Sequence, residues 1–244
     1  MSKTAGIIII GNEILSGKTQ DSNSYFLCTE LRALGVDVQR VSVIPDDVNL
    51  IGEQAASFAK QWDFVFTTGG VGPTHDDVTM EGIAHGFGVK VVLHPDLVAR
   101  LHARHGKNIN EARLRLAEVP EGAELIKLDS MFLPVTKFRN VYIFPGIPKI
   151  FYDQFRAIKD RFRDSPFYLK VIYVKETEGA IAATLNQLQA NYPQLGLGSY
   201  PVLGDPDYKV KLTLESKNKE YLGRAFDELV SALPSETIHR IEDH

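Results

Sequence analysis

The segment from Thr67 to Thr79, TTGGVGPTHDDVT, combines three kinds of residue that can act on a phosphate. Its glycines allow sharp turns and a close approach of the backbone to a ligand, its threonines supply hydroxyls, and two adjacent aspartates supply carboxylates. An apolar stretch at 64–66 precedes the segment, and a helix is predicted to begin at Thr79. A strand, a glycine turn and a helix N-terminus together form the usual anion site of α/β proteins. The candidate residues are Thr68, Gly69, Gly70, Gly72, Thr74, Asp76, Asp77 and Thr79.

The adjacent carboxylates of Asp76 and Asp77 would repel a phosphate unless a cation lay between them and the ligand. The segment therefore predicts a phosphate-bearing ligand bridged by a divalent metal. Mg, Mn, Co and Ni all stay open, because oxygen-rich sites discriminate by geometry and metal availability. The alternative is that the glycines only make a tight turn and the aspartates only cap the following helix.

Three further segments carry small or acidic residues directly after a predicted strand. They are 11–23, 45–47 and 145–148. Because ligands bind beyond the carboxyl ends of parallel strands, we expect these segments to meet the glycine segment. Glu13 lies in an otherwise apolar stretch, and a buried acid needs a partner, so we expect a role in the site. Asp46 is also a candidate for the site, with the alternative that it only caps the next helix. The further candidates are Gly11, Asn23, Pro145, Gly146 and Pro148.

Covalent catalysis is disfavoured by the motifs of this sequence. It contains neither a Gly-Lys-Ser/Thr phosphate loop nor a Gly-x-Ser-x-Gly elbow, and its single cysteine, Cys28, lies in a helical pattern. Metal-assisted attack by water or by another phosphate is the favoured chemistry.

The elements that would position these residues alternate between strand and helix. Apolar or β-branched runs at 7–10, 36–44, 62–68 and 141–144 predict strands, and further short strands are expected at 89–93 and near 125–133. Helices are expected at 23–34, 48–61, 79–87, 95–105 and 149–162, with a helical stretch near 111–117. This alternation predicts an α/β domain, 1–165, in which a mostly parallel sheet forms the middle of three layers.

The pattern changes after Asp164. Strands are expected at 168–175, 195–202, 208–215 and, at the edge, 237–241, with helices at 178–190 and 219–233. The order β-α-β-β-α-β predicts a small α+β domain over 166–244. Acidic residues outnumber basic ones there, which argues against an RNA-binding module.

The composition of the chain excludes several classes of partner. A net charge of −4 and a pI of about 6.0 give no indication of nucleic acid or membrane binding. A single cysteine suits a reducing compartment, and the apolar run at 7–10 is too short for a signal sequence or a membrane span. We therefore expect a cytoplasmic protein.

The motifs together resemble the molybdopterin-binding (MoaB/MogA-like) superfamily. Within it, the chain is most similar to the N-terminal domain of animal-type FAD synthases, and next to the N-terminal domain of CinA proteins. The similarity rests on GNEILSGKTQDSN at 11–23, RVSVIPDDV at 40–48, GGVGPTHDDVT at 69–79, NVYIFPGIP at 140–148, LGLGSYP at 195–201 and YKVKLTLES at 208–216.

This resemblance implies a three-layer α/β domain with a small appended α+β domain, in a homo-oligomer. It also implies metal-dependent hydrolysis of FAD to FMN and AMP, or of ADP-ribose. The alternatives are binding of molybdopterin with transfer of AMP to it, for which Asp46 and Asp77 match the functional acids, and a nucleotide-sensing module without catalysis. The sequence ends before a synthase or deamidase half, so FAD synthesis is not expected.

The leading hypothesis assigns a role to each candidate residue. Asp76, Asp77 and Glu13, with Asp46, would hold the divalent cation, and the N–H groups of the three glycines would bind phosphate oxygens. Asn23 and Thr79 would orient phosphate or water, and 145–148 would line the base or ribose. In the second domain, Gly198, Tyr200 and Lys209 would cover the flavin side of the substrate.

Overall fold

The computed structural model describes residues 2–106, 109–128 and 131–243. The chain divides into two compact units, 1–164 and 165–244, and each is considered by itself. The division expected from the sequence, between 165 and 166, lies one residue from this boundary.

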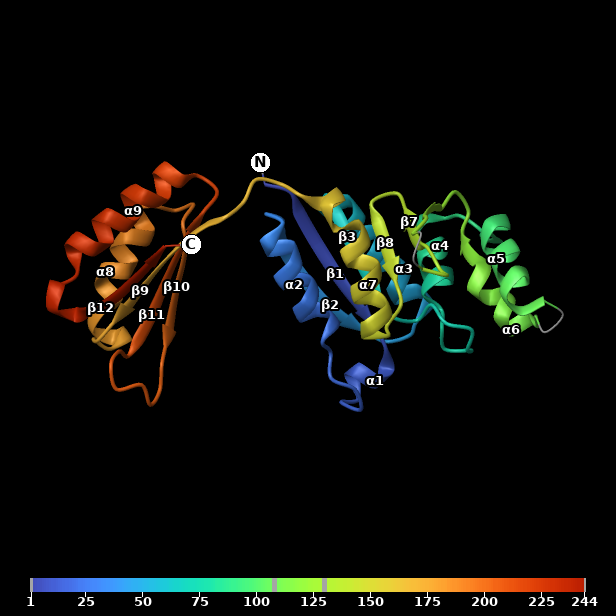
Figure 1. The fold of residues 1–244 in the computed structure, drawn as a ribbon, viewed down its shortest axis with the longest axis horizontal. Helices are drawn as coiled ribbons and strands as arrows, with labels where there is room; N and C mark the ends of the chain where they lie inside the picture. Colours follow the sequence, from blue (N-terminus) through green and yellow to red (C-terminus); the bar gives the residue numbers. More distant parts are fainter. Residues whose placement is uncertain (1, 107–108, 129–130, 244) are drawn as a thin grey trace. The chain divides into compact units, whose positions relative to one another are not determined.

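The first unit is built on a six-stranded sheet in the order β2-β1-β3-β8-β7-β6 (Figure 1). The first four strands are parallel, whereas β7 and β6 run antiparallel to their neighbours. This parallel-rich sheet confirms the predicted α/β class. The strands are β1 (Thr4–Ile10), β2 (Asp37–Ile44), β3 (Phe64–Thr68), β6 (Glu124–Ile126), β7 (Val135–Phe138) and β8 (Val141–Phe144).

Helices cover both faces of this sheet, as the uniformly apolar strand at 7–10 predicts. Ile7 and Ile9 pack with α2 (Asn23–Ala33) and α7 (Pro148–Ile158) in one core cluster. Ile8 and Ile10 point to the opposite face, where they pack with α3 (Val48–Gln61) and α4 (Thr79–Phe87). The sheet is therefore the middle of three layers.

A smaller layer lies beside α4 and differs from the expected arrangement. β4 (Val91–Leu93) pairs with β5 (Glu118–Pro120) in a separate two-stranded sheet and does not join the main one. It packs with α5 (Pro95–His105), α6 (Glu111–Leu114) and the 3-10 turn η2 (Arg115–Ala117) around a core of its own. Part of the strand region expected near 125–133 lies outside the described residues.

The second unit has the predicted β-α-β-β-α-β order. Its sheet, β10-β11-β9-β12, is antiparallel throughout, with β12 at one edge. Both helices pack against one face of that sheet in a single apolar cluster. The elements are β9 (Tyr168–Val174), α8 (Glu178–Asn191), β10 (Gly196–Pro201), β11 (Val210–Ser216), α9 (Lys219–Ala232) and β12 (Ile238–Asp243).

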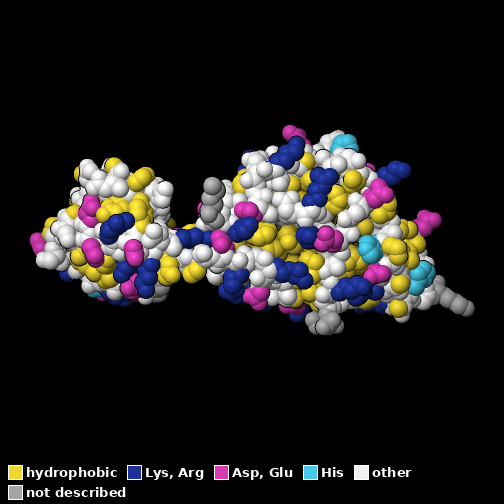
Figure 2. Space-filling model, turned by 90° about the horizontal axis from the view of Figure 1, so that it is seen from above, with side chains coloured by type: hydrophobic (Ala, Val, Ile, Leu, Met, Phe, Trp, Pro, Cys, Tyr) yellow, Lys and Arg dark blue, Asp and Glu magenta, His cyan; other side chains and the backbone are white. Residues whose placement is uncertain are grey.

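The surface carries charges of both signs. On the described part of the face in Figure 2, Lys and Arg side chains are interspersed with Asp and Glu side chains. None of the described helices is long and apolar enough to cross a membrane.

Three glycines set the distance between α3 and α4, and with it the position of the helix that follows the glycine segment. A Cβ added at Gly86 would lie 2.1 Å from the carbonyl oxygen of Gly52, and one at Gly52 would lie 2.6 Å from the carbonyl oxygen of Gly82. Real Cβ atoms do not approach backbone so closely, so the helix backbones touch.

Gly86→Ala should therefore lower the free energy of unfolding of the first unit by about 1–3 kcal/mol, because overpacking outweighs the gain in helix propensity. Urea unfolding followed by the fluorescence of Trp62, the single tryptophan, measures this change. Gly223→Ala in α9 is the control: nothing lies within 4 Å of its added Cβ, so it should leave the Trp62 transition unchanged and stabilise the second unit, as followed by circular dichroism. A Gly86→Ala variant as stable as the parent would contradict the close packing.

Candidate functional site

The four loops singled out in the sequence meet at the carboxyl edge of the parallel strands. After β3, the Gly69 N–H donates to the Phe144 carbonyl (3.2 Å) at the end of β8. After β1, the Asn12 N–H donates to Asp46 Oδ2 (2.9 Å), which follows β2. This convergence, expected from the order of strands, places the candidate residues along one edge of the sheet.

The glycine loop adopts a backbone that only glycine accommodates well. Gly69 has a φ of 107° and Gly70 a φ of 61°. A Cβ at Gly69 would also lie 2.0 Å from the carbonyl oxygen of Ile10. Gly69 is thus needed for the turn. Its N–H, from which a phosphate contact was predicted, is engaged by the Phe144 carbonyl, so that contact stays a prediction.

Thr79 secures the loop from the start of α4. It is fully buried, its N–H donates to the Gly70 carbonyl (2.9 Å), and its hydroxyl donates to the Gly69 carbonyl (2.8 Å). The structure therefore gives Thr79 a positioning role in place of the expected contact with phosphate or water.

Asn23 and Thr68 tie together three of the converging segments. Asn23 Nδ2 donates to Thr68 Oγ1 and to the carbonyl of Gly146, both at 2.9 Å. The Thr68 hydroxyl in turn donates to the Pro145 carbonyl (2.9 Å). Both side chains are buried, so they fix the loop after β8 instead of facing a ligand. Pro148 has a comparable structural role as the first residue of α7.

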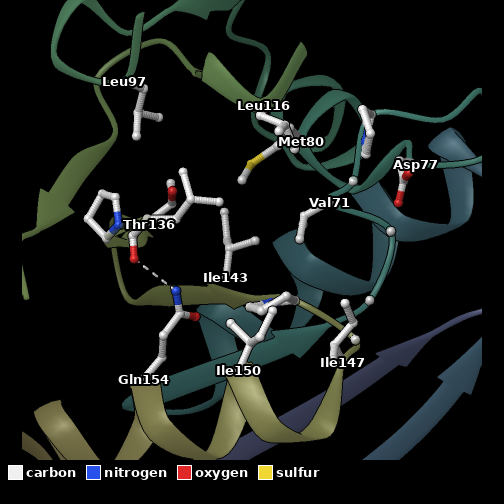
Figure 3. Close-up of a pocket in the computed structure, with 18 of the residues that line it drawn as sticks. Val71, Asp77, Met80, Leu97, Leu116, Thr136, Ile143, Ile147, Ile150 and Gln154 are labelled. Carbon is white, nitrogen blue, oxygen red and sulfur yellow. Dashed lines mark hydrogen bonds between the residues drawn. The ribbon is translucent and has the colours of Figure 1, made fainter. Parts of the chain in front are cut away.

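A cavity of about 530 Å³ opens beside the glycine loop (Figure 3). Glu13 and Asp77 are the carboxylates among its lining residues, and most of the other side chains are apolar. The predicted residues that line it are Glu13, Gly69, Gly70, Gly72, Asp77, Pro145 and Gly146.

Apart from Ile147, which lies in the expected segment 145–148, the apolar walls of this cavity were not anticipated from the sequence. Ile147 is the N-cap of α7, and Ile150 and Gln154 lie within the helix. The three residues follow each other at helical spacing along the face turned to the cavity. That spacing after Pro148 is a signal that could have found them. The remaining unanticipated residues that line the cavity are Val71, Pro73, Met80, Leu97, Leu116, Leu133, Pro134, Thr136 and Ile143.

Asp77 is held in a defined orientation. Its Oδ2 accepts hydrogen bonds from the N–H (2.9 Å) and the hydroxyl (2.5 Å) of Thr74. Arg115, in η2, binds the same turn. Its guanidinium donates to the carbonyl oxygen of Thr74 and to that of Asp77, the latter at 3.0 Å. No sequence pattern indicated Arg115, which lies 38 residues from the aspartate.

Asp76 lies apart from its neighbour. Its side chain is 61% exposed, His75 Nδ1 lies 3.9 Å from its Oδ1, and it does not line the cavity. The Thr74 hydroxyl and the backbone N–H of Asp76, followed by the charges of His75 and Arg115, lower the pKa of this carboxyl below its usual value. Asp76 is therefore ionised at neutral pH, but its carboxylate faces solvent and not the cavity.

The other acids divide into structural and cavity-facing groups. Asp47 caps α3 by accepting from the Leu50 N–H (2.8 Å), which leaves Asp46 to hold Asn12. Glu13, in the short helix α1 (Asn12–Leu15), is exposed, so the burial argument that selected it is wrong. Its carboxylate nevertheless lies over Gly11, where an added Cβ would be 2.5 Å from Oε1, at the edge of the cavity.

A metal ion enclosed by protein ligands does not fit these residues. No three His, Cys, Asp or Glu side chains in residues 2–106, 109–128 and 131–243 lie together as a ligand set. Glu13, Asp76 and Asp77 are thus not brought together as expected. The two carboxylates that line the cavity instead suit Mg²⁺, which commonly takes one or two carboxylates and completes its shell with waters and substrate phosphates.

The second-unit candidates lie in and beside its sheet. Gly198 and the exposed Tyr200 are in β10, and the Lys209 N–H donates to the Val174 carbonyl (2.8 Å) just before β11. Their contact with a ligand stays a prediction.

Comparison with known families accounts for both units. Residues 6–164 match the family model for a probable molybdopterin binding domain, and 166–242 match that for the middle domain of FAD synthase. The chain belongs to the molybdopterin-binding domain family. Both matches agree with the resemblance drawn from the motifs.

Similar proteins match this chain over different shares of their own length. A protein of Archaeoglobus fulgidus is 37% identical, with 92% of this chain and 97% of the relative covered. A probable FAD synthase of Caenorhabditis elegans is 34% identical over 89% of this chain, which spans only 47% of that relative. The crystal structure of CinA from Thermoplasma acidophilum, described as a protein of unknown function, has a TM-score of 0.61 and 31% identity. It covers 66% of this chain and all of its own.

Replacing the Thr79 hydroxyl tests its positioning role. Thr79→Val keeps the shape but leaves the buried Gly69 carbonyl without this donor, so the free energy of unfolding should fall by about 1–3 kcal/mol. Thr79→Ser retains the hydroxyl and should lose less. Urea unfolding followed by Trp62 fluorescence compares the two, and equal losses would show that the hydrogen bond does not hold the loop.

Proposed function

We propose that this protein is a metal-dependent nucleotide pyrophosphatase that hydrolyses FAD to FMN and AMP, or ADP-ribose to ribose 5-phosphate and AMP. The observation that carries the proposal is one cavity that combines a glycine loop, two carboxylates and a large apolar wall. A dinucleotide presents the matching parts, a diphosphate and ring systems. The similarity to a nematode protein named a probable FAD synthase supports a flavin nucleotide as the ligand.

The glycine loop would bind the diphosphate. Gly70 and Gly72 line the cavity, and their N–H groups would bind non-bridging oxygens and offset the negative charge that grows during attack. The loop is held by Thr79 and by the strand ends, so its donors are organised before substrate arrives.

Glu13 and Asp77 would hold a divalent cation at the cavity. When bound, the cation neutralises phosphate charge and favours ionisation of an attacking water. Thr74 keeps the Asp77 carboxylate in place. Its N–H and its hydroxyl both donate to Oδ2 of Asp77. Asp46 acts one step further away, by fixing Asn12 next to Glu13.

The reaction adds one water across the P–O–P bond. The water oxygen bonds to one phosphorus as the bridging oxygen leaves with the other phosphate. One water proton passes through a cavity carboxylate to solvent, and the other stays on the new phosphate. No covalent enzyme intermediate is required.

A second candidate is adenylyl transfer to molybdopterin. It is favoured by the family match over residues 6–164. In that case the same pocket would bind the pterin, whose phosphate oxygen would attack the α-phosphorus of ATP and release pyrophosphate. Hydrolysis of FAD or ADP-ribose would then be slow.

Product analysis decides between these activities. Metal-stripped protein incubated with FAD or ADP-ribose should release AMP together with FMN or ribose 5-phosphate only after Mg²⁺, Mn²⁺, Co²⁺ or Ni²⁺ is added, as followed by chromatography. Transfer of AMP from ATP to molybdopterin without FAD cleavage would favour the second candidate. Binding of FAD without any product would indicate a sensing module.

The two neighbouring aspartates should respond differently to loss of charge. Asp77→Asn should lower metal-dependent turnover roughly 100-fold or more, because it removes a cavity carboxylate while its amide oxygen can still accept from Thr74. Asp76→Asn should lower turnover less than about 10-fold, because that side chain faces solvent.

Steady-state rates measured over a range of metal concentrations test this difference. Asp47→Asn is the matched control, since asparagine caps a helix as well as aspartate does. Turnover of Asp77→Asn equal to that of the control would remove Asp77 from the mechanism, and a greater loss in Asp76→Asn would move the metal to the exposed acid.

A further inference from the structure

The apolar end of the cavity contains one polar group that the proposed reaction does not use. Gln154, on α7, is only 2% exposed and lines the cavity (Figure 3). Its Nε2 donates to the Leu133 carbonyl (3.1 Å). Its Oε1 is buried and has no hydrogen-bond partner among the residues that the structure describes.

The orientation of this amide is determined by its neighbour. If the amide were flipped, Oε1 would face the Leu133 carbonyl oxygen and two acceptors would repel each other. Gln154 therefore offers an acceptor and not a donor to whatever occupies the cavity.

The surroundings of Gln154 fit a flat ring. Met80, Leu97, Leu116 and Ile143 come from four different elements to line the same chamber (Figure 3). At its rim, the large apolar side chain of Ile147 is 61% exposed. Apolar side chains that surround one convergent polar atom are typical of a small-molecule pocket, and exposed apolar side chains at the rim gain from being covered.

We infer that this chamber binds the heteroaromatic ring of the nucleotide, and that Gln154 Oε1 selects rings that present an N–H donor. The adenine amino group and the flavin imide N–H both supply such a donor, so the shared chemistry is a planar ring with a hydrogen-bonding N–H. This inference deepens the proposed function and rests on it for the class of ligand.

The selection follows from the cost of an unpaired buried acceptor. A ring without the donor would leave Oε1 desolvated and unpartnered, which weakens binding roughly 10-fold relative to the ring that pairs with it. A variant without the amide should bind both rings equally, because there is no acceptor left to satisfy. Gln154 is thus a specificity residue and takes no part in the hydrolytic step.

Calorimetric titration of the full chain with Mg²⁺ tests this inference without requiring turnover. One arm compares AMP with purine riboside 5′-monophosphate, which lacks the amino group, and the other compares FMN with N3-methyl FMN. The parent should prefer the donor-bearing ligand roughly 10-fold in at least one arm, and that arm identifies the ring. Gln154→Met should bring the preference to within about twofold.

A second variant covers the case in which Gln154→Met unfolds. Ile150→Trp narrows the chamber and should weaken binding of the same ring-bearing ligand at least roughly 10-fold, while binding of inorganic pyrophosphate stays within about twofold. No donor preference in either arm, or ring binding unaffected by Ile150→Trp, would overturn the inference and leave a trapped water as the partner of Oε1. Donor-dependent binding without FAD or ADP-ribose cleavage would instead overturn the proposed function alone.

Discussion

The site depends on a close approach of backbone to backbone at Gly69. A Cβ on this residue would collide with the Ile10 carbonyl oxygen. The N–H of Gly69 donates to the Phe144 carbonyl. The ends of β1 and β8 therefore both contact the turn after β3. The direction of the glycine loop that lines the cavity follows from this contact.

Around that contact, the buried polar side chains form hydrogen bonds to backbone carbonyls of the loops. Thr79 bonds to the carbonyl of Gly69, while Asn23 and Thr68 bond to each other and to the segment after β8. These are side chains that a reader of the sequence would assign to a ligand, because they carry hydroxyl and amide groups at the right end of the strands. Their burial shows that a large part of the polar chemistry of the motif organises the loops.

The sequence predicted the sheet, both units and the convergence of loops, because apolar runs and strand–helix alternation report directly on layers. It failed where the outcome depends on packing between distant segments. The strand at 91–93 pairs with 118–120 outside the main sheet. This pairing was not predicted because 118–120 lies in a region without clear periodicity. Glu13, Asp76 and Asp77 look equivalent as acids, but only two of the three line the cavity. The apolar chamber is formed by elements spread between residues 71 and 154, so no local sequence pattern predicts it.

The clamp formed by Arg115 has an electrostatic consequence. Its guanidinium donates to the carbonyl oxygens of Thr74 and Asp77, and its Nε lies 3.8 Å from the carboxylate of Glu118. The positive charge is thus shared with neutral peptide dipoles and with an acid of the adjoining small layer. Arginine in this position stiffens the turn without forming an ion pair with the Asp77 carboxylate. The layer formed by α5, α6 and η2 is in this way coupled through Arg115 to the turn that carries Asp77.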